Sequence, residues 1–325
     1  MHPKLFEIPF INWPIGTYGP MLVIGFLVAI TLIRHLCKKY NTNPQHITNA
    51  ALYSLIGGVI GARLFYVIHY FDSYRYNLFD IFKVWKGGLE LLGGVVVAIA
   101  VILFYLKYHK LPIRRYLDIL AIGLMLALVF GRIGCFLNGC CFGKPTDFSL
   151  AVRFPYHSYA YYNQVNPNLE RNRSEPHLKL PDEYFYYMNE QGFGELKSFN
   201  ELSVQQQKEV LDGKYRCLPV HPTQLYSSAS AATICLILFL FWKRAEKNPT
   251  GFLTQPGSTF SLMFILYGIM RLNIEFLRDD NPFEYAWWAV YKGGTVSQNI
   301  SIYMMILGII LVVLFNAAKY KKLKA

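Results

Sequence analysis

Seven long apolar stretches divide this 325-residue chain, and they constrain its fold more than any other feature of the sequence. A helix needs roughly 17–25 residues to cross the hydrocarbon core of a bilayer. Each stretch is long and apolar enough to do so. The stretches are Thr17–Ile33, Ala50–Tyr70, Leu91–Tyr108, Leu117–Asn138, Leu225–Trp242, Thr259–Leu277 and Asn299–Ala317. We therefore predict an all-α integral membrane protein that folds as a multi-pass, seven-span helical bundle.

The composition excludes the main soluble classes. Apolar residues make up 54% of the chain and charged residues 16%, whereas a soluble domain carries about 25% charged residues. So few charged side chains cannot cover a globule of this size. This excludes a soluble enzyme and a nucleic-acid-binding domain, and the net charge of +12 is attributed to membrane topology. Six cysteines are also too few for a disulfide scaffold.

The basic residues of the short loops predict the orientation. They follow the first, third and fifth stretches and fill the C-terminal tail: Arg34, Lys38, Lys39, Lys110, Arg114, Arg115, Lys243, Arg244, Lys247, Lys319, Lys321, Lys322 and Lys324. Basic loops stay in the cytoplasm, so the N-terminus is expected outside and the C-terminus inside. Residues 1–138 then hold spans one to four, and residues 225–325 hold spans five to seven with a basic cytoplasmic tail. Residues 139–224 form an enlarged outer, periplasmic loop or a small folded cap.

Ionisable residues inside spans cost about 2.5–3.5 kcal/mol each to insert and usually face a cavity. The clear cases here are Arg63, Arg132, Arg271 and Glu275. At a rise of about 1.5 Å per residue, the three arginines fall in the outer half of the bilayer. Arg271, Glu275 and Arg278 share one helix face because their spacing is i, i+4 and i+7. Three arginines with one carboxylate leave surplus positive charge, which favours an anionic-lipid site because guanidinium groups bind phosphate well.

Two further polar residues approach the same zone from the outer side. Tyr18 opens the first span, and His221 precedes the fifth. Two other interpretations remain open. An arginine can pair with Glu275 simply to hold helices together, and buried arginines also suit an anion transporter. Transport is disfavoured because the inner half of the spans is nearly free of charge.

Six motifs follow one another in order along the chain. Residues 131–143 read GRIGCFLNGCCFG. The other five are Tyr18-Gly19, Gly61–Val67, Trp85–Leu89, the HPTQLY segment at 221–226 and the RxxxExxR pattern at 271–278. Together they resemble the phosphatidylglycerol–prolipoprotein diacylglyceryl transferase family, whose signature reads GRxGNFxNxExxG. The resemblance covers nearly the whole chain apart from the outer loop, which is longer than usual.

The resemblance implies an enzyme that transfers the diacylglyceryl group of phosphatidylglycerol to the lipobox cysteine thiol of prolipoproteins, the first step of lipoprotein maturation. It implies the bacterial inner membrane as the location. Phosphatidylglycerol, prolipoprotein signal peptides bearing a lipobox cysteine and membrane lipids are the expected partners, with no nucleic acid, cofactor or metal. The expected catalytic residues are Arg132, Arg271, Glu90 and Tyr18. The expected substrate-binding residues are Arg63, Tyr66, Asn138, Gly143, His221, Gln224, Tyr226, Glu275 and Arg278.

The chemistry of this reaction explains why these residue types are needed. The leaving phosphodiester gains charge as it becomes a phosphomonoester, and fixed cations such as Arg132 and Arg271 stabilise that charge. The acceptor thiol has an ordinary pKa of about 8.5 and needs a base or a cationic environment to become a thiolate. Glu90, Tyr18 and His221 are the candidates for this base.

The sequence also departs from the family pattern. Cys135 and Cys140 replace the signature Asn and Glu, and Leu92 stands where the family usually has a His or Tyr. A non-catalytic or repurposed phospholipid-binding relative is therefore the alternative. Glu90 can replace the missing group only if residues 87–94 are not a regular helix, and four glycines in this run favour an irregular turn. For the cysteines, an inert or structural role is favoured over a disulfide and over catalysis.

Overall fold

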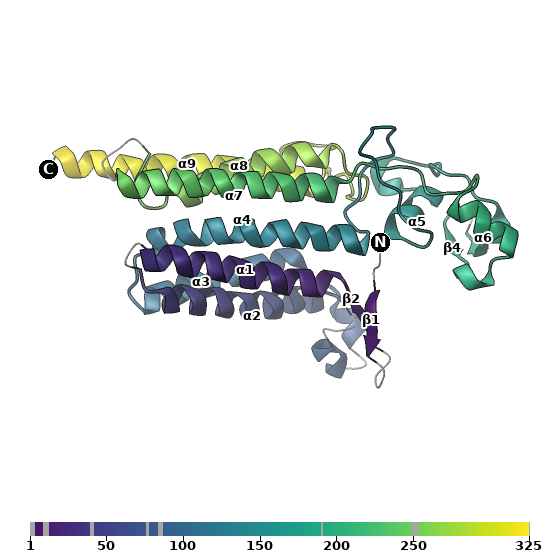
Figure 1. Cartoon of the computed structure of the whole chain (residues 1–325), viewed down its shortest axis with the longest axis horizontal. Helices are drawn as coiled ribbons and strands as arrows, with labels where there is room; N and C mark the ends of the chain where they lie inside the picture. Colours follow the sequence, from purple (N-terminus) through teal and green to yellow (C-terminus); the bar gives the residue numbers. More distant parts are fainter. Residues whose placement is uncertain are drawn as a thin grey trace.

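Seven long helices make up most of the protein. The computed structural model describes residues 4–8, 13–39, 42–75, 78–83, 87–189, 191–248 and 253–324. The long helices are α1 (Tyr18–Lys39), α2 (Pro44–His69), α3 (Leu91–Tyr108), α4 (Ile113–Asn138), α7 (Thr223–Lys247), α8 (Ser258–Glu275) and α9 (Val296–Lys324). Figure 1 shows α4 between α1, α2 and α3 on one side and α7, α8 and α9 on the other, with β1 and the end of α9 at opposite ends of the bundle. Each predicted apolar stretch corresponds to one of these helices.

The capacity to span a membrane is clearest for five helices. By length and composition, α1, α2, α4, α7 and α9 are long and apolar enough to cross. The apolar part of α3, Leu92–Tyr108, is shorter, and α8, which carries Arg271 and Glu275, is not among the five. A helical membrane protein with several spans is therefore confirmed. The two remaining helices have 18 residues each, which is near the lower limit for a span.

Short elements lie outside the bundle. At the N-terminal end, β1 (Lys4–Ile8) pairs antiparallel with β2 (Trp13–Gly16). The short 3-10 helices η1 (Phe71–Tyr74) and η2 (Leu78–Phe82) follow α2. The all-α prediction thus holds for the bundle, whereas small hairpins occur at its ends. Trp85 and Lys86, which belong to one of the family motifs, lie outside the described residues.

Helix α4 ends at a glycine turn, and a residue near its start is bound to α8. At its C-terminus, Gly139 has a φ of 79°, and its N–H bonds back to carbonyls of the last turn. Glycine adopts this left-handed conformation without strain, so the chain folds back over the end of the helix. Near the N-terminus of α4, the buried carboxylate of Asp118 accepts hydrogen bonds from the backbone N–H groups of Gly257 and Phe260, at 2.6 and 2.8 Å. Asp118 therefore caps the start of α8 and ties it to α4.

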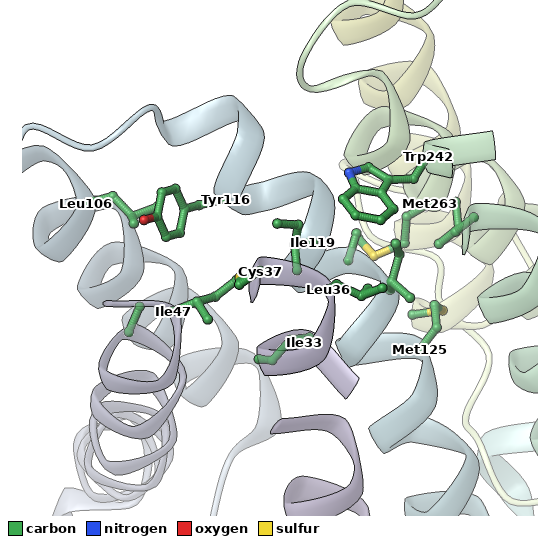
Figure 2. Close-up of a cluster of buried hydrophobic side chains, with 14 of the residues drawn as sticks. Ile33, Leu36, Cys37, Ile47, Leu106, Tyr116, Ile119, Met125, Trp242 and Met263 are labelled. Atoms are coloured by element: carbon green, nitrogen blue, oxygen red, sulfur yellow. The ribbon is translucent and has the colours of Figure 1, made fainter. Parts of the chain in front are cut away.

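The main hydrophobic core joins the two groups of helices (Figure 2). Tyr116 and Ile119 of α4 are fully buried in this cluster, and Tyr116 lies beside Leu106 of α3. Trp242 of α7 and Met263 of α8 close the other side of the same cluster. Because α4 contacts both groups here, this core fixes the position of α8 relative to α4. These two helices carry the arginines predicted to form the site.

Residues 142–220 form a cap with a core of its own, at the end of the bundle away from the C-terminus (Figure 1). Tyr161 and Tyr184 are fully buried at its centre, and Cys217 is 1% exposed. Its elements are α5 (Tyr159–Val165), η4 (Leu169–Arg171), η5 (Asp182–Tyr184), β3 (Phe185–Met188), β4 (Gly194–Leu196), η6 (Phe199–Glu201) and α6 (Val204–Leu211). The segment has many internal hydrogen bonds, so it is a folded unit and not an irregular insertion.

Candidate active site

Three arginines gather where α4 and α8 end beneath the cap. Arg132 lies near the C-terminus of α4, Arg271 lies in the last turns of α8, and Arg278 follows that helix. The guanidinium of Arg132 interacts electrostatically with those of Arg271 and Arg278. Like charges this close repel each other, so the cluster requires counterions.

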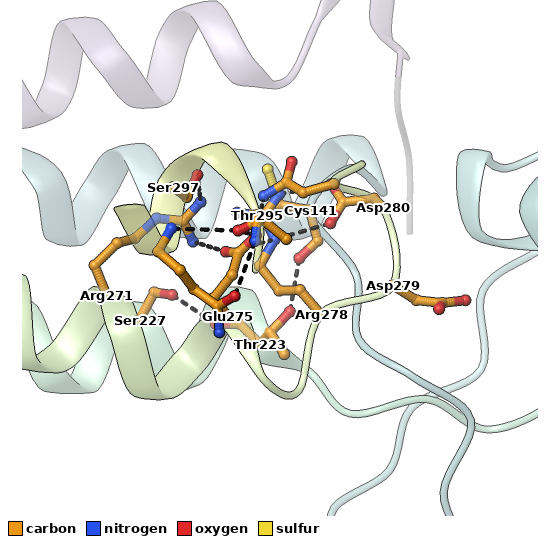
Figure 3. A network of polar contacts seen from close by, with 12 residues as sticks. Cys141, Thr223, Ser227, Arg271, Glu275, Arg278, Asp279, Asp280, Thr295 and Ser297 are labelled. Atoms are coloured by element: carbon orange, nitrogen blue, oxygen red, sulfur yellow. Dashed lines mark hydrogen bonds and ion pairs between the residues drawn. The ribbon is translucent and has the colours of Figure 1, made fainter. Parts of the chain in front are cut away.

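The carboxylates of Glu275 and Asp280 compensate part of the positive charge of the arginine cluster (Figure 3). Glu275, whose side chain is fully buried, pairs with Nη1 of Arg271 at 2.7 Å and lies 3.8 Å from Nε of Arg278. Its other oxygen accepts hydrogen bonds from Thr295 and Asn281. Arg271 also donates to the hydroxyl of Ser297 at 2.7 Å.

Arg278 has a carboxylate of its own. Asp280 accepts two parallel hydrogen bonds from it, at 2.8 Å from Nε and 2.6 Å from Nη2. Burial opposes the charge on this guanidinium, but the Asp280 contact raises the pKa of Arg278 above its usual value. Arg278 is therefore held charged and in a fixed orientation.

Arg132 is the member of the cluster that lacks a counterion. Within the described part of the chain it has no hydrogen-bond or carboxylate partner, and its Nε is buried without a hydrogen bond. Three guanidinium groups against the carboxylates of Glu275 and Asp280 leave one positive charge uncompensated. A buried unpaired cation is costly, so the cluster is suited to bind an anion. A phosphate fits the planar donors of arginine.

The loop after α4 places backbone against the end of α8. The N–H of Gly143 bonds to the carbonyl of His221 at 3.1 Å, and Gly143 forms an antiparallel bridge with Arg278. A Cβ on Gly143 would lie 2.6 Å from the carbonyl oxygen of His221 and 2.9 Å from that of Leu277. Only glycine fits where these backbones approach so closely. Gly143 therefore allows the loop to pack against the end of α8.

The first residues of α7 hold the same loop from the other side. The hydroxyl of Thr223 donates to the carbonyl of Cys141 at 2.7 Å, and the amide of Gln224 donates to the carbonyl of Cys140 at 2.7 Å. Gln224 is fully buried. These bonds explain why the HPTQLY segment and the signature stretch are needed together: one fixes the backbone of the other.

Arg63 has contacts of a different kind. Its guanidinium donates hydrogen bonds of 2.6–2.9 Å to four backbone carbonyls, those of Asp80, Ile81, Gly87 and Gly88. Arg63 therefore fixes the connection between α2 and α3. The sequence predicted that Arg63 shares one zone with the other arginines, but its hydrogen bonds are to this connection.

Tyr66 lies beside the same connection. Its ring is 5.8 Å from the guanidinium of Arg63 and packs against Tyr70. Gly88 has a φ of 76°, and a Cβ there would lie 2.5 Å from the Tyr66 ring, so only glycine fits. Arg63 and Tyr66 thus shape the turn that precedes α3.

The comparisons with known proteins decide the family. A sequence model of the family "Prolipoprotein diacylglyceryl transferase" matches residues 3–314. The chain belongs to this family. It is 28% identical over 322 residues to the phosphatidylglycerol–prolipoprotein diacylglyceryl transferase of Clostridium tetani, with 99% of this chain and 100% of the relative covered. It is 30% identical over 319 residues to the enzyme of the same name from Buchnera aphidicola (strain APS), with 95% of both chains covered. The predicted family is thereby confirmed.

Two other positions of the family pattern lie at the arginine cluster. Tyr18, the first residue of α1, interacts electrostatically with Arg132 and with the thiols of Cys135 and Cys140. The side chain of Asn138, at the end of α4, lies near the Cys140 thiol and interacts with it. Both residues therefore lie next to the loop that follows α4.

The side chain of His221 lies next to Tyr226, which belongs to the same HPTQLY segment. Its Nδ1 lies 3.5 Å from the hydroxyl of Tyr226, and its ring is 6.3 Å from that of Phe148. Burial lowers the pKa of His221, so the ring is neutral at pH 7. A neutral imidazole accepts a proton, which keeps His221 among the candidate bases.

The irregular turn expected over residues 87–94 is present only in its first half, which includes Glu90. Residues 87–90 are non-helical, with positive φ at Gly87 and Gly88, and α3 begins at Leu91. The carboxylate of Glu90 lies 3.5 Å from Nδ1 of His69. Leu92 is 55% exposed on the first turn of α3. The two residues thus have different surroundings, and their roles can be separated by substitution.

We expect Glu90→Gln to lower the transfer rate by about 100-fold or more if its carboxylate is the general base. Leu92→Ala removes only exposed apolar surface, so its rate is expected to stay near that of the unchanged protein. Both variants are compared in one assay of transfer to a lipobox peptide. An unchanged rate for Glu90→Gln would transfer the base role to Tyr18 or His221.

The cap holds the backbone that follows α8, a feature that sequence reasoning missed. Arg171, 9% exposed, donates to the carbonyl of Asn281 at 2.5 Å and to that of Arg278 at 3.0 Å. Asp279 accepts from Asn163 at 2.8 Å. Although burial opposes it, a hydrogen bond from His177 and nearby arginines hold the pKa of Asp279 below its usual value. The cap therefore positions Arg278.

We expect Arg171→Ala to reduce transfer by about tenfold or more, because the loss of hydrogen bonds from a buried charged donor costs about 1.5–3 kcal/mol. The backbone of residues 278–281 would lose its anchor while every residue of the arginine cluster remains. Arg153→Ala is the matched control, since exposed Arg153 donates to the carbonyl of Cys217 within the cap. Equal rates for the two variants would show that the anchor does not position Arg278.

Proposed function

We propose that this protein transfers the diacylglyceryl group of phosphatidylglycerol to the lipobox cysteine of prolipoproteins in the bacterial inner membrane. The observation that carries the proposal is the cluster of Arg132, Arg271 and Arg278 with its uncompensated charge. Membership in the diacylglyceryl transferase family and the names of its relatives support the same substrates.

The cluster is suited to the leaving group of this reaction. Attack of the acceptor sulfur at the glyceryl carbon breaks the carbon–oxygen bond to the phosphate, and glycerol phosphate leaves with additional negative charge. Arg132 has donors free to receive that charge. Arg271 is oriented by Glu275 and Ser297, and Arg278 by Asp280. Fixed cations of this kind lower the barrier without reorganising during the reaction.

The membrane arrangement that goes with this function has seven spans, with the N-terminus and the cap outside. The order of the helices, with β1 and the end of α9 at opposite ends of the bundle, supports an odd number of crossings (Figure 1). Basic residues at the other end, in the last turns of α1 and α7 and after α3, favour the cytoplasm there. The arginine cluster then lies toward the outer face, where prolipoprotein signal peptides present their cysteine.

The orientation predicts a labelling pattern. We expect Val204→Cys, at a cap position that is 85% exposed, to react with a membrane-impermeant maleimide in intact cells. Lys247→Cys, at the exposed end of α7, is expected to react only after permeabilisation. Native Cys217 is a poor reporter because burial raises the pKa of its thiol to about 11. The reverse pattern would overturn the orientation.

The direct test uses purified protein with radiolabelled phosphatidylglycerol and a lipobox peptide. Transfer of label to the peptide cysteine is the expected result, and a Cys→Ser peptide should receive none. Leu92 favours one alternative function, a phospholipid-binding relative without catalysis. Saturable binding of phosphatidylglycerol without any transfer would support that alternative and reject the proposed enzyme.

A further inference from the structure

The side chains of Cys135 and of the adjacent pair Cys140 and Cys141 come together beside the arginine cluster. The Sγ atoms of Cys135, Cys140 and Cys141 all lie within 4.8 Å of one another. Cys135 lies in the last turn of α4, and the left-handed Gly139 folds the next residues back over that turn. The N–H of Cys140 then bonds to the carbonyl of Cys135 at 3.2 Å.

The backbone that presents these sulfurs is held from outside the loop. Thr223 and Gln224 bind the carbonyls of Cys141 and Cys140, as described above. Cys141 also has a φ of 61°, a left-handed conformation that is uncommon for a residue other than glycine. The three sulfurs are therefore brought together by hydrogen bonds of α4 and α7, and not only by local flexibility.

Two cationic side chains lie near one member of the trio, since Arg132 and Arg278 both interact electrostatically with Cys141. A thiophilic metal ion binds thiols as thiolates and displaces their protons when it binds. A tetrahedral site with Zn–S bonds of about 2.3 Å needs sulfurs about 3.8 Å apart, so a small contraction of the trio suffices.

We propose that Cys135, Cys140 and Cys141 form a three-thiolate site for a thiophilic divalent cation such as Zn²⁺, with its fourth position open. In the described part of the chain, no fourth His, Cys, Asp or Glu joins the group. Three protein ligands with one open position are typical of catalytic zinc, whereas structural zinc has four. The sequence spacing gave no sign of this site, because its ligands meet only after the chain reverses at Gly139.

A disulfide explains the trio less well. It would join two of the sulfurs and leave the third, although all three are equally part of the cluster. Bonding the adjacent Cys140 and Cys141 would close a small strained ring. A metal ion, in contrast, is coordinated by all three cysteines.

The open position is suited to the acceptor thiol, an assignment that rests on the proposed function. Coordination of the lipobox cysteine releases its proton to water and leaves a metal-bound thiolate. This sulfur forms the bond to the glyceryl carbon while the carbon–oxygen bond to phosphate breaks. The electron pair stays on the phosphate oxygen next to the arginines. The interaction of Cys141 with Arg132 and Arg278 places the sulfur site and the phosphate site side by side.

The binding experiment uses the full-length protein, purified in detergent and fully reduced, with Zn²⁺ alone as the probe. Elemental analysis after dialysis should give one Zn²⁺ per chain, and Cd²⁺ should give a thiolate charge-transfer band. Each of Cys135→Ser, Cys140→Ser and Cys141→Ser is expected to weaken Zn²⁺ binding by about 100-fold. Cys235→Ser, which changes a thiol within α7 outside the trio, should leave it unchanged.

No stoichiometric Zn²⁺ and no charge-transfer band in the unchanged protein would overturn the site without any need for variants. A disulfide between two of the three cysteines in protein purified without reductant would also overturn it. Transfer is measured on the same samples with and without a chelator. Full activity after Zn²⁺ removal would reject the role of the open position while the proposed function stands. Bound Zn²⁺ with no transfer under any condition would instead reject the proposed function and leave the metal site intact.

Discussion

Arg132→Ala is expected to lower the rate of diacylglyceryl transfer by at least about 100-fold, the loss typical when one preorganised charge-stabilising donor is removed. Arg132 is the one guanidinium of the cluster, among the described residues, without a carboxylate partner. Its charge is therefore available to the phosphate, and its removal leaves no buried carboxylate unpaired. The loss should appear mainly in kcat, because the charge on the leaving group develops in the transition state.

Arg132→Lys tests whether charge alone is sufficient. An ammonium keeps the charge but cannot make the two-pronged contact that phosphate accepts from a guanidinium. We expect this variant to recover less than about a tenth of the lost activity. Arg153→Ala in the cap serves as the control for loss of a distant arginine. Near-normal transfer by Arg132→Lys would show that the site needs only a positive charge and not the paired donors of a guanidinium.

The helices of the bundle were predictable from the sequence because length and hydrophobicity alone determine them. A stretch such as Leu117–Asn138 is apolar for many consecutive residues, and the structure contains α4 there. The sequence did not predict how α8 starts. Asp118 looks like an isolated charge near the end of a span, yet it caps α8 through contacts about 140 residues further along the chain.

The arginine cluster was partly predictable for a similar reason. Arg271 and Glu275 share a face of α8 by spacing, and their pairing follows. Arg278 was expected on the same helix face, but α8 ends at Glu275, and Arg278 lies beyond it in a bridge with Gly143. Arg63 was expected in the same zone because of its depth in the membrane. Depth gives the height of a residue in the bilayer but not the direction of its side chain. Its guanidinium is instead bound to carbonyls of the loop before α3.

The remaining site residues could not be predicted from the sequence, because their roles depend on tertiary contacts and not on local sequence patterns. Asp280 and Ser297 are ordinary polar residues of loops and helix ends in the sequence, yet they orient two of the arginines. Arg171 belongs to the cap, and its contact with residues 278–281 arises only when the cap packs on the bundle. The three cysteines converge through one glycine turn.

The second large effect is expected for Arg271, and it needs a paired design. Arg271→Ala leaves the carboxylate of Glu275, whose side chain is fully buried, without its 2.7 Å partner. Breaking a buried ion pair by removing one member costs about 3–5 kcal/mol of stability. The single variant therefore combines loss of phosphate binding with loss of stability. Transfer is expected to fall by at least about 100-fold, but this result alone does not separate the two causes.

The double variant Arg271→Ala with Glu275→Gln separates them. The substituted amide carries no charge, and its oxygen can still accept the hydrogen bonds that Thr295 and Asn281 donate to Glu275. We expect the double variant to regain thermal stability in detergent, because no buried charge is left unpaired. Its transfer rate is expected to stay as low as that of Arg271→Ala, because the guanidinium that contacts the phosphate is still missing. Recovery of both stability and transfer would show that Arg271 serves only to neutralise Glu275, and the phosphate would then be bound by Arg132 and Arg278.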